Sequence, residues 1–113
     1  MTLIDIALKG ADANTLASGG IYEGNPPSEE AENMIEPGKR KAKAWSKDLE
    51  PGAYTFQIDA EAPAGTALSV AVTNHATGNG PAAAPVPMNG QPGTVVEYIQ
   101  NVPFTVAADG TVS

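Results

Sequence analysis

Apolar and polar residues alternate along most of the chain, and this alternation predicts β-strands rather than helices. In residues 54–59, Tyr54, Phe56 and Ile58 share one face of the predicted strand, and polar residues share the other. Three further segments repeat the pattern: residues 4–8, 68–72 and 102–106. We expect the inner rows of these strands to form a single core around the following residues: Ile6, Phe56, Ile58, Val70, Val72 and Phe104.

Turn-forming residues separate the predicted strands at intervals typical of a β-sandwich. Pro51-Gly52 precedes the strand at 54–59, and Asp109-Gly110 predicts a two-residue hairpin turn. Residues 95–99 are apolar at both odd and even positions, which predicts a strand covered on both faces. We therefore predict an all-β fold, an antiparallel two-sheet β-sandwich of jelly-roll or Ig-like type with about seven to eight strands.

Two segments depart from the strand pattern. Residues 29–34 predict one short helical turn, with Ser28 as its N-cap and Pro37 beyond its end. Residues 74–93 form a long loop rich in proline and glycine, and such a loop in a small domain is usually functional or mobile. Because the loop also carries the apolar residues Val86 and Met88, we expect it to lie against a protein surface.

Length, cysteine content and charge narrow the functional classes. The 113 residues predict a single domain, spanning 1–113, and the absence of cysteine excludes a disulfide framework. The net charge of −7 argues against nucleic acid as a partner. Residues 1–9 lack the basic start and cleavage site of a signal peptide, and no apolar run approaches the roughly 20 residues that span a membrane. We expect synthesis in the cytoplasm without a signal peptide and no membrane partner.

The charged residues are clustered along the chain. Acidic residues concentrate in positions 23–36, and five of the six basic residues follow in positions 39–47, among them Lys41, Lys43 and Lys47. Lysines often protect the exposed edge of a sheet, so the basic cluster is typical of a solvated edge strand. The same arrangement also suits an electrostatic contact with a protein partner or with another copy of the chain.

Trp45 lies inside this basic cluster. Strict alternation places the neighbouring alanines on the inner face and Trp45 on the outer face among the lysines. An exposed tryptophan serves as a platform for sugar rings or as an anchor for a protein partner. A bulge near Ser46 would instead turn Trp45 inward, and both alternatives remain open. Tyr22 is a second candidate for an aromatic platform.

Residues 45–72 read WSKDLEPGAYTFQIDAEAPAGTALSVAV. This stretch resembles the L-x-x-G-x-Y-x-F/V strand of carbohydrate-binding jelly rolls and of bacterial pre-peptidase C-terminal domains. It also resembles the L-x-P-G-x-Y turn of collagen-adhesin B-type repeats. The resemblance implies an extracellular-type β-sandwich in which a turn at Gly52 leads into a core strand carrying Tyr54.

The adhesin repeats form an internal Lys–Asn isopeptide bond. The resemblance implies Lys9 and Asn101 as the candidate pair. The glutamate that the adhesin motif requires is Ile58 here, so Asp59 or Glu61 would have to replace it. For the sugar-binding modules, no ligand residue matches a defined position of this chain.

The sequence offers little catalytic chemistry. His75 is the one histidine, and no serine motif or second metal ligand accompanies it at a recognisable spacing. Oxygen-bearing side chains near Glu23 and Asp109 would suit calcium, but no calcium-loop motif assigns a site. We therefore predict a non-enzymatic protein without catalytic residues, a bound metal or a cofactor.

A structural or interaction protein is the leading hypothesis. A sandwich of extracellular type without cysteine or a signal peptide fits a virion component, which folds in the cytoplasm and leaves by lysis. We expect a capsid-decoration-type or other assembly protein, located in the virion or outside the cell after lysis. It would assemble through residues 74–93, with Val86 and Met88 buried against another subunit. The alternative is a carbohydrate-binding module that uses Trp45 and Tyr22.

Overall fold

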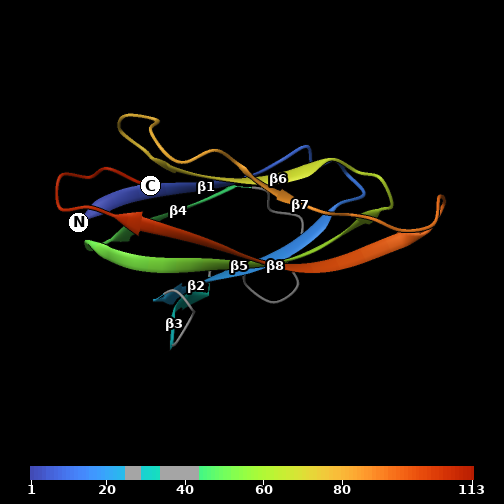
Figure 1. The fold of residues 1–113 in the computed structure, drawn as a ribbon, viewed down its shortest axis with the longest axis horizontal. Coiled ribbons are helices and arrows are strands. Elements are labelled where there is room, and N and C mark those ends of the chain that lie inside the picture. The colour runs from blue at the N-terminus through green and yellow to red at the C-terminus, as the bar shows by residue number, and fades with distance from the viewer. Residues whose placement is uncertain (25–28, 34–43) are drawn as a thin grey trace.

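The computed structural model describes residues 1–24, 29–33 and 44–113, with the backbone alone at 29–33. The described chain is all-β without a helix and forms two packed antiparallel sheets (Figure 1). The first sheet contains β1 (Thr2–Lys9), β4 (Ala44–Leu49), β6 (Leu68–Asn74) and β7 (Ala84–Val86). The second sheet contains β2 (Leu16–Glu23), β3 (Glu29–Asn33), β5 (Gly52–Pro63) and β8 (Val95–Val106).

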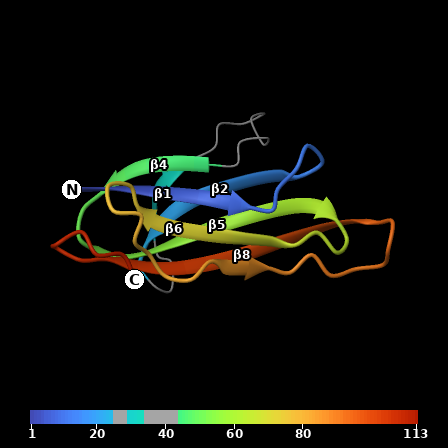
Figure 2. The same ribbon diagram turned by 90° about the horizontal axis from the view of Figure 1, so that it is seen from above.

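Most neighbouring strands are not consecutive in the chain. The order is β4-β1-β6-β7 in the first sheet and β3-β2-β5-β8 in the second. Strand β2 pairs with β5, β5 with β8, and β1 with β4, a spacing along the chain that Greek-key connections create. The chain therefore crosses repeatedly between the sheets, and its two ends lie at the same end of the sandwich (Figures 1 and 2).

The core lies between the two sheets and contains every core residue that the alternation predicts. Those six side chains are at most 3% exposed, which confirms the predicted inner rows. The ring of Phe56 on β5 meets that of Trp45 on β4 with centroids 5.7 Å apart, so this contact joins the sheets. Gly19 of β2 faces the same ring, and a Cβ there would lie 2.4 Å from the Cζ of Phe56. The glycine thus leaves the space that the ring fills.

Strand β5 begins at the turn that the sequence predicts. Its inner row includes Tyr54, whose ring stacks on Phe104 with centroids 5.6 Å apart. The Tyr54 hydroxyl donates a hydrogen bond of 2.7 Å to the carbonyl oxygen of Glu50, so its polar tip has a partner beside the turn. The aromatic body and the polar tip together fix the start of the strand.

The predicted helical turn at 29–34 is wrong, because Glu29–Asn33 forms strand β3. This segment pairs with β2, and the register shifts between Ile21 and Tyr22. A single helical turn gains few backbone hydrogen bonds, whereas the edge of β2 offers a row of them. Ser28, Met34 and Pro37 lie outside the described residues.

The hairpin near the C-terminus is one residue longer than predicted. The N–H of Ala107 donates to the carbonyl of Thr111 at 2.8 Å, which leaves residues 108–110 as the loop. Gly110 has a φ of 88°, a left-handed conformation that closes three-residue hairpin loops and that glycine adopts without strain.

We predict that Phe56→Ala lowers the free energy of unfolding by about 3–5 kcal/mol, because it removes the ring that joins the sheets. Urea denaturation measures this loss. Gln57→Ala, on the outer face of the same strand, is the matched control and should cost far less. Equal denaturation midpoints for Phe56→Ala and the wild type would contradict the packing described above.

Candidate interaction surface

Strand β8 forms one edge of the second sheet. It pairs with β5 from Val95 to Val106 in a continuous register without a bulge. At its far end the chain folds back, and Thr105 and Ser113 exchange two backbone hydrogen bonds of 2.8 and 3.0 Å. From Val95 to Pro103, no described strand pairs with the other side of β8. We call residues 95–101 the open edge.

The direction of the backbone groups on β8 follows from its neighbours. Successive residues of a strand point their N–H and C=O groups to opposite sides. Thr105 points away from β5, because its backbone bonds go to Ser113. Thr94 points the other way, since its carbonyl accepts from Ala64 at the end of β5. Odd-numbered residues of β8, such as Val95, Ile99 and Asn101, therefore direct their backbone groups to the open edge.

Apolar side chains lie beside this edge. Val95 is 68% exposed and Ile99 60% exposed, both on the outer face of the second sheet, and Tyr98 on the opposite face is 39% exposed. The prediction that residues 95–99 are covered on both faces is therefore wrong. Asp59 lies opposite Ile99 on β5, and Glu61 lies opposite Glu97, so carboxylates border the apolar side chains.

Trp45 is not on the surface. It is 9% exposed, faces the core beside Phe56, and shares the inner face of β4 with half-buried Lys47 and buried Leu49. Its register with β1 is continuous, so no bulge near Ser46 turns it inward. Of the two open alternatives, Trp45 therefore takes the inward one without the bulge, because burying a large indole gains more free energy than burying the neighbouring alanine.

The other predicted platform and cluster residues do not form one site. Tyr22 is half-buried on the outer side of β2 in the second sheet, whereas Trp45 and Lys47 belong to the first sheet. Lys41 and Lys43 lie outside the described residues. The structure therefore does not bring Trp45 and Tyr22 together on a sugar-binding face.

Val86 and Met88 are buried, each 2% exposed, but against their own chain. Residues 84–86 form β7, which pairs with β6 and places Val86 opposite Leu68. The carbonyl of Met88 accepts a hydrogen bond of 2.8 Å from Gly65. The free edge of β6 supplies the contacts that we expected from another subunit, so this loop completes the core of its own chain.

The structure brings together three polar side chains that the sequence did not connect. Asp5 on β1 accepts a hydrogen bond of 2.6 Å from the Ser46 hydroxyl through Oδ1 and lies 2.8 Å from Nδ1 of His75 through Oδ2. Both partners bind the carboxylate and the serine does not bind the histidine, so His75 is not placed to activate the hydroxyl. The Ser46 hydrogen bond, assisted by His75, holds the pKa of the Asp5 carboxyl below its usual 3.8.

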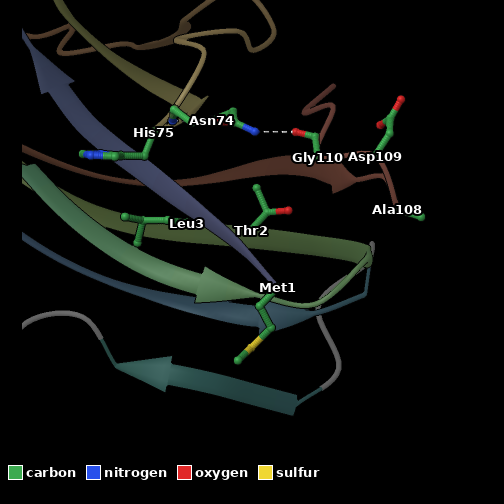
Figure 3. A pocket seen from close by; sticks show the side chains of 9 residues that line it. Met1, Thr2, Leu3, Asn74, His75, Ala108, Asp109 and Gly110 are labelled. Carbon is green, nitrogen blue, oxygen red and sulfur yellow. Dashed lines mark hydrogen bonds between the residues drawn. The ribbon is translucent and has the colours of Figure 1, made fainter.

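A shallow depression lies where the start of β1, the turn after β6 and the C-terminal hairpin meet (Figure 3). Asn74 Nδ2 donates a hydrogen bond of 2.7 Å to the Gly110 carbonyl there. The backbone N–H of Thr111 bonds to Asp109 and lowers the pKa of that carboxyl. The His75 ring points away from Asp109 (Figure 3), so these two groups are not arranged for proton transfer.

The isopeptide and calcium hypotheses find no support in the geometry. Lys9 lies on the outer face of the first sheet, and Asn101 lies on the outer face of the second, where it accepts a hydrogen bond of 3.0 Å from Gln57. Within the described part of the chain, no three acidic or histidine side chains gather as metal ligands. Nor does any described helix have the length and hydrophobicity to cross a membrane.

No protein-family model, curated protein or solved structure matches the chain. Its function therefore has to be inferred from its own residues and geometry.

We predict that Ser46→Ala raises the pKa of Asp5 towards 3.8, because it removes the strongest hydrogen bond to the carboxylate. Carboxyl-detected NMR titration measures this value, and Ser69→Ala on neighbouring β6 is the control. Since the folded pKa is lowered, the stabilisation from Asp5 is present above pH 3.8 and is lost as the pH falls through the folded value. A Ser46→Ala variant with the wild-type Asp5 titration would refute this assignment.

Proposed function

We propose that the chain is a non-enzymatic structural protein that assembles through the open edge of β8, as a capsid-decoration-type component of a virion or of a comparable assembly. The open edge is the observation that supports this function. Its outward backbone groups are placed to bond an added strand, and Val95 and Ile99 lie exposed beside them. A protein of this kind would be found in the virion or, after lysis, outside the cell.

The open edge carries little of the usual protection against strand addition. Proteins commonly protect long edges with lysine, proline or a bulge. The open edge contains neither lysine nor proline, Glu97 is its one charged residue, and its ladder with β5 is regular. Exposed apolar residues beside an unprotected edge favour pairing with another chain over a solitary monomer.

The strand order supports the jelly-roll class over the Ig-like class. If the strands are renumbered so that β3 is the first and β1 and β2 are the last two, both sheets take the strand order of an eight-stranded jelly roll. The two chain ends lie at one end of the sandwich, as such a shifted starting point requires (Figure 1). Jelly rolls occur in viral capsid proteins and in lectins, so this class is compatible with the proposed role.

Charge and burial narrow the partner to a protein. A net charge of −7 opposes binding to nucleic acid or to an anionic lipid surface. The sugar-binding alternative depended on an exposed Trp45, and that side chain packs inside the core. Assembly with a protein is therefore the function that a described surface feature, the open edge, supports.

We predict that the protein assembles in one of two ways. Either light scattering shows a mass above the 11.5 kDa of one chain as the concentration rises, or the protein binds to a larger particle. Val95→Lys should abolish either form of assembly with little change in melting temperature, because the side chain is 68% exposed beside the open edge. Thr105→Lys is the matched control, since it lies on the same face where Ser113 already covers the edge. A wild-type protein that stays monomeric and binds no particle would contradict the proposed function.

A further inference from the structure

The open edge is limited at both ends of the segment. Pro103 has no N–H to donate, and from Thr105 onward the edge is occupied by the C-terminal residues. On the other side the chain turns away from the strand at Gly93, whose φ is 84°. An added strand can therefore pair fully with residues 95–101 and with little beyond them.

We infer that the strand that adds to this edge is the same segment of a second copy, antiparallel to the first and related by a twofold axis at Tyr98. This inference rests on the proposed function and names its partner. Identical patches face each other across a twofold interface, so the two segments have the same length and the same limits. Joining the two edges makes one continuous sheet from the second sheets of both copies.

The alternation of backbone groups selects the register. Strands pair when outward-pointing residues lie opposite outward-pointing residues, and odd-numbered residues have this role on β8. With the axis at Tyr98, Val95 lies opposite Asn101 of the second copy, and every outward residue of the segment has a counterpart. With the axis at Ile99, Val95 lies opposite Pro103 at both ends of the paired segment, so the Val95 carbonyl of each copy has no donor opposite it.

The side chains favour the same register. Tyr98 directs its backbone towards β5, so at the axis it forms a non-hydrogen-bonded pair with Tyr98 of the second copy. Side chains approach each other most closely in pairs of this kind. Paired aromatic side chains across strands stabilise a sheet, and Tyr98 is 39% exposed in the single chain. On the outer face, Ile99 lies beside the aliphatic stem of Glu97 from the second copy.

Disulfide trapping tests the register directly, because the chain has no cysteine. A residue on the axis lies opposite the same residue of the second copy, with a Cα–Cα separation within the range of a disulfide. We expect Tyr98→Cys to give a cross-linked dimer under mild oxidation, roughly tenfold faster than Ile99→Cys, which would lie opposite Glu97. Faster cross-linking of Ile99→Cys would overturn the register.

A proline pair tests the backbone contribution independently of any cysteine. Ile99→Pro removes an outward N–H and should prevent dimer formation, whereas its ladder to β5 stays intact. Gln100→Pro removes an inward N–H and should lower the melting temperature instead. If the wild type assembles and Val95→Lys blocks it, but Tyr98→Cys does not cross-link, a different partner occupies the edge. That result overturns self-pairing and leaves the proposed function standing, whereas a wild type that never assembles overturns both.

Discussion

The position of Phe56 between the two sheets constrains most of the structure. The ring lies against Trp45 from the first sheet and over Gly19 of the second. A shift of one residue along β5 would expose Phe56 and bury Gln57, so this contact strongly favours one register. Because β5 pairs with both β2 and β8, the same contact also decides which residues of those strands face the core.

The exposed part of β8 follows from the lengths of the strands. Strands β5 and β8 each contain 12 residues, whereas those of the first sheet contain between 3 and 8. A ladder of that length extends about 40 Å, and the first sheet covers only part of it. Tyr98 therefore remains partly exposed although it points to the inner side. The feature that supports assembly is thus a consequence of how the core is built.

Alternation along the sequence was sufficient to predict the inner rows of β1, β5, β6 and the second half of β8. It could not decide the face of Trp45, because alternation separates two faces without saying which one is buried. The burial of Val86 and Met88 was predicted, but its partner was wrong, since the sequence does not show that β6 has a free edge. Asp5, Ser46 and His75 meet only through strand pairing across 41 and 70 residues of chain.

The open edge was also missed at the level of sequence, although one signal was present. Pro103 lies within an otherwise regular strand, and proline in a strand is typical of an edge. This signal predicts β8 at the edge of a sheet, and it explains why residues 95–99 are apolar on both faces without being covered.

Amide hydrogen exchange along β8, measured by NMR at low and high protein concentration, tests the central claim most directly. In the dilute monomer, the amides of Val96, Tyr98 and Gln100 should be protected by β5, whereas those of Ile99 and Asn101 should exchange rapidly. On assembly, Ile99 and Asn101 should become protected while the Tyr98 amide changes little. Rapid exchange of Ile99 and Asn101 in the assembled protein would contradict the conclusion that β8 is the edge through which this protein assembles.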